Sequence, residues 1–138
     1  MKELLSNWHE VVKKQDARLL KSMLDKDAVF HSPILFKPQK GRKLVMTYLL
    51  AAAKMFEDAN FRYVKEVTHG QEAVLEFNAE VDGIHIDGVD IITANEDGYI
   101  TEFKVMLRPL KAIEKVGEKM KANLDDMSLW DKLKWKLS

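Results

Sequence analysis

The sequence predicts an α+β fold in which helices come first and an antiparallel sheet follows. In the first half of the chain, apolar residues recur at three- and four-residue spacing, which is typical of amphipathic helices. From Phe61 onward they alternate with polar residues, as in half-buried strands, and helical spacing returns after Pro109. Helices and strands that are segregated along the chain indicate the α+β class.

Three helices and one short strand are predicted before the sheet. Helical stripes cover residues 4–12, 19–24 and 44–56, and Asp16 is a natural N-cap for the second helix. Residues 28–32 form a short apolar run that Pro33 ends, because proline has no amide hydrogen to give to a ladder. This run is therefore predicted to be a short strand.

The second half predicts a meander of four strands. Turn sequences at residues 68–71, 82–83 and 95–98 separate the apolar runs at hairpin spacing. Neighbouring strands are therefore expected to be antiparallel. A further helix is predicted after Arg108-Pro109, since proline is tolerated in a first helical turn.

A chain of 138 residues and 15.9 kDa suits a single domain. We expect this domain to span residues 1–123 and residues 124–138 to form a C-terminal amphipathic helical appendage. Lysines alternate with apolar residues in the appendage, so a membrane surface is one possible partner. Asp125, Asp126 and Asp131 weaken that alternative, and packing on the domain or on a second subunit is favoured.

The composition excludes several kinds of partner and site. Lys plus Arg and Asp plus Glu both number 22, so net charge favours neither nucleic acid nor a membrane. The sequence contains no cysteine, and its four histidines lack the spacing of metal ligands, so no metal or cofactor is predicted. Neither a leader nor a membrane-spanning run is evident. We therefore expect a soluble, cytoplasmic protein.

Asp90 is the leading candidate for a functional residue. It interrupts the apolar run Val89 to Ile92, and a buried carboxylate is costly unless it is paired, hydrogen-bonded or protonated. We interpret it as a pocket acid whose pKa is raised by burial. The alternative is a structural carboxylate bonded to a neighbouring strand or to a tryptophan on a helix.

Four short motifs carry a family resemblance: residues 27–33 (DAVFHSP), 40–42 (KGR), 87–90 (DGVD) and 97–103 (DGYITEF). In this order and spacing, the chain resembles the nuclear transport factor 2-like superfamily, in its polyketide-cyclase-like (SnoaL-like) branch. The resemblance implies a conical, cystatin-like fold, with three N-terminal helices packed on a curved antiparallel sheet and C-terminal helices. It also implies an apolar pocket inside the cone.

Relatives in this superfamily suggest roles for single residues. Asp90 of this chain matches the protonated aspartate on the central strand of ketosteroid isomerase. Trp8 falls at its hydrogen-bonding tyrosine, and Ser32 replaces its general base. In limonene epoxide hydrolases, Gly88 and Arg108 stand in place of an arginine and a second aspartate. This chain therefore lacks a catalytic group that each of the two relatives uses.

Asp90 and His31 are the candidate catalytic residues. Strand alternation predicts that His31 faces away from the cone or lies at its mouth, and a structural histidine is the alternative. The candidates for ligand binding combine aromatic, apolar and hydroxyl side chains, each with core packing as its alternative: Trp8, Phe30, Ser32, Tyr48, Leu75, Phe77, Ala79, Phe103, Val105 and Leu107.

The predicted function is the binding of a hydrophobic small molecule, with cofactor-independent isomerisation, cyclisation or hydrolysis if the protein is an enzyme. The alternative is a non-catalytic dimeric protein-interaction module with a filled cone. A homodimer through the sheet is expected. Lys104 lies on the opposite strand face from Phe103, where it can meet Glu76 or Glu80 across a two-fold axis.

Overall fold

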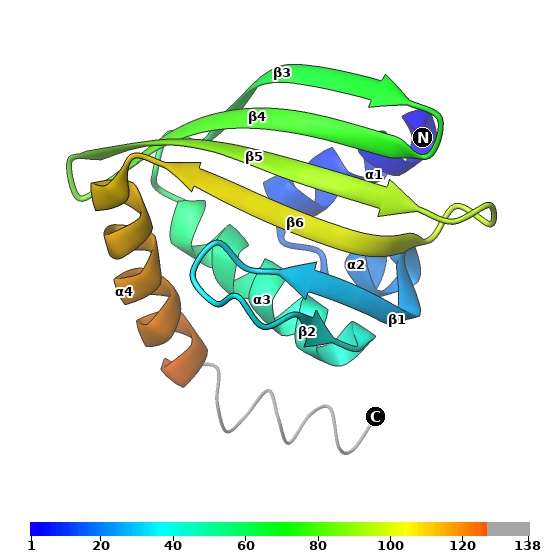
Figure 1. Cartoon of the computed structure of the whole chain (residues 1–138), viewed down its shortest axis with the longest axis horizontal. Coiled ribbons are helices and arrows are strands. Elements are labelled where there is room, and N and C mark those ends of the chain that lie inside the picture. The colour runs from blue at the N-terminus through cyan, green and yellow to red at the C-terminus, as the bar shows by residue number, and fades with distance from the viewer. Residues whose placement is uncertain (127–138) are drawn as a thin grey trace.

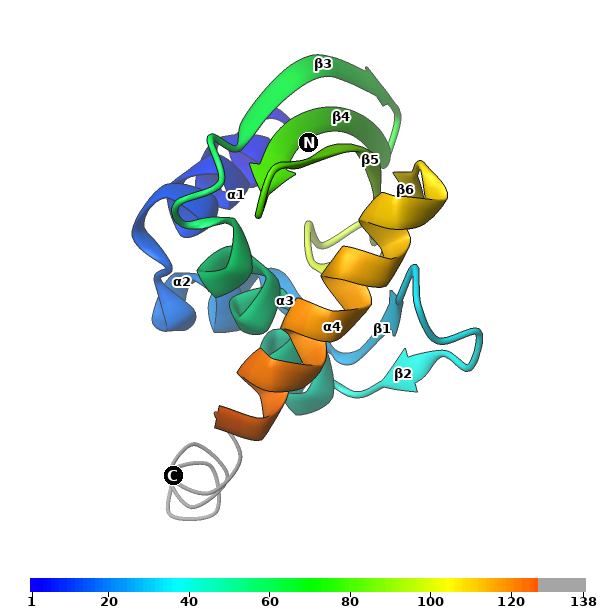
Figure 2. The same cartoon turned by 90° about the vertical axis from the view of Figure 1, so that its left-hand side faces the viewer.

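A strongly curved six-stranded sheet wraps around the helices in the computed structural model, which describes residues 1–126 (Figures 1 and 2). The elements in chain order are α1 (Lys2–Lys14), α2 (Ala17–Met23), β1 (Leu24–His31), β2 (Gln39–Lys40), α3 (Arg42–Phe56), β3 (Arg62–His69), β4 (Glu72–Val81), β5 (Ile84–Ala94), β6 (Ile100–Arg108) and α4 (Leu110–Asp126). The predicted α+β class is confirmed.

The sheet has the strand order β2-β1-β6-β5-β4-β3. Strands β3 to β6 form the predicted antiparallel meander, and β1 joins it in parallel beside β6. The structure extends β1 back to Leu24, four residues before the predicted start, and adds the two-residue strand β2, which the sequence did not predict.

Local sequence explains where the elements begin and turn. The Asp16 carboxylate accepts a hydrogen bond of 3.1 Å from the Leu19 amide, which confirms the predicted N-cap of α2. Asp82 and Gly83 both have positive φ, 50° and 79°, between β4 and β5. That conformation matches the twist of a tight hairpin, and it favours the Asp-Gly pair found here.

The inner face of the sheet builds the core together with the helices. One buried cluster lies under α1, α2 and α3 and includes Trp8, Phe30 and Phe103. A second cluster joins the other end of the sheet to α4 and includes Phe77 and Val116. The helices therefore cover the concave side of the sheet, as the conical fold requires.

A bulge in β3 changes the alternation that the sequence predicted. Tyr63 pairs with Phe77, but Lys65 pairs with Glu76, so Val64 is an extra residue. After the bulge Val67 pairs with Val74 on the outer face and is 55% exposed. The alternation predicted from Phe61 onward is therefore interrupted in β3, and Val67 lies on the outer face.

Helix α4 passes the domain boundary predicted near residue 123. It continues to Asp126, and the Asn123 side-chain amide donates a hydrogen bond of 3.2 Å to the Ala51 carbonyl in α3. Most of the predicted appendage, residues 124–138, lies outside the described residues.

Candidate active site

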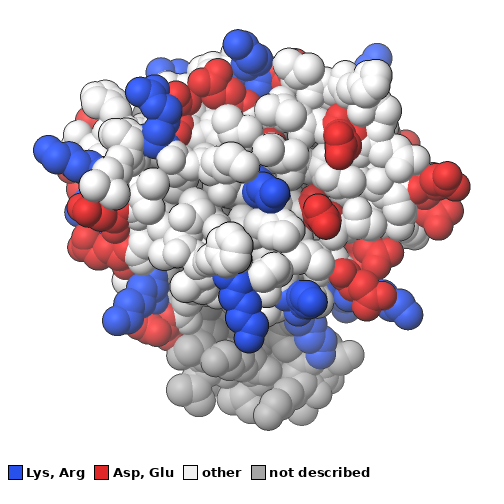
Figure 3. All heavy atoms as spheres, in the orientation of Figure 1, with Lys and Arg blue, Asp and Glu red and all other residues white. Residues whose placement is uncertain are grey.

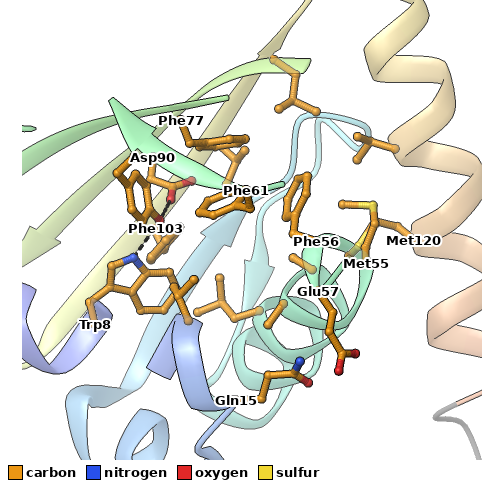
Figure 4. A pocket seen from close by; sticks show the side chains of 18 of the residues that line it. Trp8, Gln15, Met55, Phe56, Glu57, Phe61, Phe77, Asp90, Phe103 and Met120 are labelled. Carbon is orange, nitrogen blue, oxygen red and sulfur yellow. Dashed lines mark hydrogen bonds between the residues drawn. The ribbon is translucent and has the colours of Figure 1, made fainter. Parts of the chain in front are cut away.

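A cavity of about 480 Å³ lies between the inner face of the sheet and helices α1, α3 and α4. Figure 2 shows strands β3, β4 and β5 arching over the region that these helices border. The walls are mainly apolar and aromatic, and Figure 4 shows Phe56, Phe61, Phe77 and Phe103 gathered there. Cavities of this size and lining are typical of sites for small apolar ligands.

A chain of hydrogen bonds crosses one end of the cavity. The Trp8 indole Nε1–H, from α1, donates to the Tyr63 hydroxyl oxygen over 2.9 Å. The Tyr63 hydroxyl, from β3, donates to Oδ2 of Asp90 on β5 over 2.5 Å. All three side chains line the cavity, so an apolar chamber ends in one connected polar group (Figure 4).

Burial controls the protonation of this group. Asp90 is 5% exposed, and the loss of hydration raises its pKa from 3.8 to about 7, although the hydrogen bond from Tyr63 partly opposes the rise. Burial, followed by the neighbouring Asp90 charge, raises the Tyr63 pKa well above its usual value. Near neutral pH, Asp90 therefore exists in both forms while Tyr63 stays protonated.

The number of protons determines what the chain offers a ligand. With Asp90 ionised, the indole N–H and the phenol O–H are both used within the chain, and only acceptor oxygens remain. With Asp90 neutral, the hydrogen-bond chain has three donor hydrogens, on the indole, the phenol and the carboxyl group, but only two hydrogen bonds within it. One hydrogen-bond donor is then left for a ligand oxygen.

Gly88 allows an aromatic side chain to form the wall beside Asp90. A Cβ at Gly88 would lie 2.7 Å from both Cε1 and Cε2 of Phe77 and closer still to Cζ, so the Phe77 ring occupies the space of the missing side chain. The arginine that epoxide hydrolase relatives carry at this position does not fit beside that ring. This part of the cavity is therefore apolar.

Of the residues predicted from sequence, Asp90 and seven others border the cavity: Trp8, Phe30, Ser32, Phe77, Phe103, Val105 and Leu107. They come from α1, from inward positions of β1, β4, β5 and β6 and, in the case of Ser32, from the loop after β1. The other four predicted residues, His31, Tyr48, Leu75 and Ala79, are not among the cavity-lining residues.

Strand alternation and core packing explain these four positions. His31 lies between the lining residues Phe30 and Ser32 and so faces the other side of β1. Tyr48 stacks on Phe30 with ring centroids 5.3 Å apart. Leu75 and Ala79 belong to the two core clusters and are buried by other side chains.

Tyr63 is the functional residue that sequence reasoning missed. The alternation from Phe61 onward predicts a strand here but indicates no role for the hydroxyl, and a tryptophan on a helix was the alternative partner of Asp90. The period-two spacing of Phe61 and Tyr63 was the available signal, since inward positions of this edge strand face the cone. Helices α3 and α4 also contribute unpredicted apolar wall residues: Leu49, Ala52, Ala53, Met55, Phe56, Val116 and Met120.

Ser32 does not take over the role of a general base. Its Oγ accepts hydrogen bonds from the amides of Ile34 (3.0 Å) and Leu35 (3.2 Å), which fix the start of the loop after β1. A serine hydroxyl with no neighbouring base is also far too weak to remove a proton from carbon. Asp90, bonded to Tyr63, is therefore the candidate acid of the cavity.

Polar residues border the opposite end of the cavity. Lys13, Gln15, Glu57, Asn60 and Arg62 come from the ends of α1, α3 and the start of β3. Figure 4 shows Gln15 and Glu57 with their polar groups away from the aromatic wall. The cavity is thus polar at both ends and apolar between them.

Residues 1–126 offer neither a cluster of metal ligands nor a membrane-spanning helix. No group of three or more histidine or acidic side chains within that range is arranged to hold a metal ion. No helix in the same range is long and apolar enough to cross a membrane.

Comparisons with known proteins agree with the fold. The model of the SnoaL-like domain family matches residues 5–103. A steroid delta-isomerase from Pseudomonas aeruginosa is 33% identical, with a TM-score of 0.86 and 91% of each chain covered. A protein with a cystatin-like fold from Silicibacter pomeroyi is 32% identical, with a TM-score of 0.83, covering 96% of this chain and 92% of that one. No curated protein matches the sequence.

A more distant structure shares the fold alone. An epoxide hydrolase/cyclase-like enzyme of pyran ring formation in salinomycin is 16% identical, with a TM-score of 0.63 over 78% of this chain and 89% of that one. The fold and the cavity thus define a cone-shaped protein of the nuclear transport factor 2-like class. The chain belongs to the SnoaL-like domain family.

Proposed function

We propose that the protein binds a largely apolar, ring-containing small molecule and donates a hydrogen bond to one oxygen of that molecule. The main support for this proposal is the cavity of about 480 Å³, which ends at the hydrogen-bond chain of Trp8, Tyr63 and Asp90. A flat ring system suits walls made of Phe61, Phe77 and Phe103, because aromatic faces pack well against rings.

Acid-assisted isomerisation or cyclisation is the chemistry that this site supports best. A donor aimed at a carbonyl or ether oxygen stabilises negative charge that develops there, and its effect is larger where water is excluded. The similarity to a steroid delta-isomerase from Pseudomonas aeruginosa supports a steroid-like ring system as the ligand, and a ketone is the oxygen group that we propose for it. Because Ser32 supplies no base and neutral Asp90 acts as the acid, a proton released from carbon would pass to the ligand, to water or to another cavity residue.

The alternative function, a protein-interaction module with a filled cone, receives less support. A filled cone would place core side chains against Asp90. Instead, Asp90 lines an open cavity, whose walls are apolar side chains from three helices and the sheet.

A steroid ketone as probe tests the proposal by fluorescence or calorimetric titration. Because the neutral form of Asp90 supplies the spare donor, affinity should fall about tenfold for each pH unit above the Asp90 pKa of about 7. Asp90→Asn keeps a side-chain N–H donor, so it should bind without this pH dependence. Asp90→Leu, which has no donor, should bind at least about tenfold more weakly.

Two outcomes would refute the proposal. One is no binding of apolar ring ketones at any pH; the other is equal affinity in the wild type and Asp90→Leu. Asp97→Asn is the matched control because Asp97 is an exposed acid in the β5–β6 turn. That variant should bind like the wild type.

We also propose a homodimer that forms through the outer face of the sheet. Apolar side chains on β4, β5 and β6 lie side by side there, namely Val74, Val89, Ile91 and Met106. Figure 3 shows this face, with much uncharged surface and a few charged side chains between. Such a face is suited to a second copy, as apolar surface flanked by opposite charges favours self-association.

A further inference from the structure

The loop between β1 and β2 exposes three consecutive apolar residues, Ile34, Leu35 and Phe36, here called the apolar tip. Ile34 and Leu35 are 41% and 46% exposed, and Phe36 is exposed over its whole side chain, at 103%. We propose that this tip and the cations beside it dock the protein on an anionic lipid surface.

The tip is held in position although its side chains are uncovered. The Ser32 hydroxyl accepts the amide hydrogens of Ile34 and Leu35, and Ile34 lies over Gly117 of α4, with Cδ1 3.5 Å from the position of a Cβ there. Pro33 and Pro38 restrict the backbone on both sides. A loop that is fixed while presenting Leu35 and Phe36 outward needs no reordering to meet a partner.

Along the chain, the charged residues nearest to the tip all have one sign. The sequence has no Asp or Glu between Asp27 and Glu57. The same stretch holds a cationic flank, which we define as Lys37, Lys40 and Arg42. In residues 1–126, none of these three forms an ion pair with a carboxylate.

The balanced charge of the whole chain hides this local asymmetry. The net charge of the whole chain led to the expectation of no membrane partner, but net charge does not reveal a local excess of cations. Figure 3 shows several Lys and Arg side chains near the middle of the lower edge of the face that it views, with acidic side chains to either side. Lys40 pairs with Val29, at the base of the hairpin that carries the tip, so cations and apolar tip belong to one small unit.

An anionic lipid surface fits this combination better than a second copy of the chain. Two copies meeting at this site would bring like charges together, which is destabilising. Leucine and phenylalanine insert into the boundary between headgroups and acyl chains, while lysine and arginine remain with anionic headgroups. The attraction acts within about a Debye length, roughly 8–10 Å at physiological salt.

Lipid docking through the tip does not depend on ligand binding in the cone. Ser32 and Pro33 line the cavity, and the apolar tip follows them directly in the chain. If the cone takes a ligand from the lipid phase, docking would bring cavity and ligand together. Neither proposal requires the other.

Flotation of the full chain with phosphatidylcholine vesicles, with or without phosphatidylserine, tests the inference. The wild type should float with the vesicles that contain phosphatidylserine, and added salt should weaken its binding. Phe36→Ser should lower partitioning about tenfold, because one exposed aromatic side chain is lost from the lipid boundary. Lys37→Glu combined with Lys40→Glu should abolish binding.

Matched variants separate docking from folding and from bulk charge. Lys26→Glu changes the same charge at the other end of β1, between Asp25 and Asp27, and should float like the wild type. Phe36→Leu keeps an apolar side chain and should restore binding relative to Phe36→Ser. Binding of the steroid ketone should be equal in all these variants, so failure of docking is distinguishable from failure of the cone proposal.

Several results would overturn the inference. They are a wild type that stays soluble with phosphatidylserine vesicles, equal flotation without phosphatidylserine, and tip variants that float like the wild type. If the chain binds poly-glutamate through the same cations but no vesicle, its partner is an acidic polypeptide and not a lipid. If Phe36→Ser halves the mass measured by light scattering, the tip joins two copies instead.

Discussion

The hydroxyl of Tyr63 donates a 2.5 Å hydrogen bond to the carboxylate of Asp90 across an intervening strand. Tyr63 is in register with Phe77 on β4, and Phe77 with Gly88 on β5, two residues before Asp90. The bond therefore runs diagonally over the inner face of the sheet. One buried acid thus gains a single strong donor while the surrounding wall stays apolar.

Stability should decrease as the pH rises from about 4 to about 7. The folded pKa of Asp90, about 7, lies above the ordinary value of 3.8, so in this window the folded protein holds a proton that the unfolded chain has lost. The stability contributed by the neutral acid is complete below the unfolded pKa and is lost as pH rises through the folded one. Across this pH range, the free energy of unfolding should fall by roughly 4 kcal/mol in total.

Asp90→Asn should remove this pH dependence, which urea unfolding at several pH values measures. Above pH ~7 the variant should be more stable than the wild type, because no charge is buried. Asp97→Asn, in the exposed β5–β6 turn, should keep the wild-type profile. Parallel profiles for Asp90→Asn and the wild type would show that another group is responsible.

Tyr63→Phe should destabilise the fold by about 1–3 kcal/mol. The substitution leaves both the Trp8 indole N–H and the Asp90 carboxyl without their partner in the chain. It should also raise the Asp90 pKa further, since the hydrogen bond from Tyr63 lowers it. Denaturant unfolding and carboxyl NMR titration measure the two effects.

Tyr99→Phe is the control for loss of a phenol hydroxyl, because Tyr99 is 45% exposed in the turn before β6. Its stability should be unchanged. If Tyr63→Phe is equally neutral, the hydrogen bonds that cross the cavity contribute nothing to folding.

Gly88→Ala should cost about 1–3 kcal/mol, because the new methyl group overlaps the ring of Phe77. Phe77→Leu in the same chain should recover part of the loss, since the smaller side chain makes room. Thermal or urea unfolding of the two single variants and the double variant gives the coupling. Strictly additive effects would contradict the contact.

Gly117→Ala is the matched glycine control. Its Cβ would lie at an ordinary 3.5 Å from Ile34, in the middle of α4. Alanine is the better helix former, so this variant should be as stable as the wild type or more so, by up to about 1 kcal/mol.

Met106→Glu should convert the proposed homodimer to a monomer in light scattering. Met106 is 53% exposed on the outer face of β6, beside Val89 of β5, and a buried unpaired charge there opposes association. Val64→Glu, at the bulge of the edge strand β3, is the control and should leave the mass unchanged. A wild-type mass of one chain would reject the dimer.

Sequence alone could predict the meander of β3 to β6 and the position of Asp90, because both depend on local patterns. The turns at 68–71 and 82–83 and the strict alternation of β4 define the meander without reference to the rest of the chain. An acid within an apolar strand likewise signals burial by itself. These features need no knowledge of which strands are neighbours.

Tyr63 and the bulge at Val64 could not be predicted in the same way. The role of Tyr63 depends on Trp8 and Asp90, which lie 55 and 27 residues away in sequence. A tyrosine in an alternating strand looks the same whether its hydroxyl meets water or a buried acid. The bulge depends on how β3 follows the curved edge of the sheet, which alternation does not encode.

The contact between Gly88 and Phe77 limits the substitutions by which this cone can change its chemistry. A chain with an arginine at position 88 cannot be reached by a viable single replacement, because the ring already fills that volume. Phe77 must first be replaced by a smaller residue, and that substitution alone leaves a void in the wall of the cavity. Laboratory evolution toward an arginine-bearing site should therefore change position 77 before, or together with, position 88.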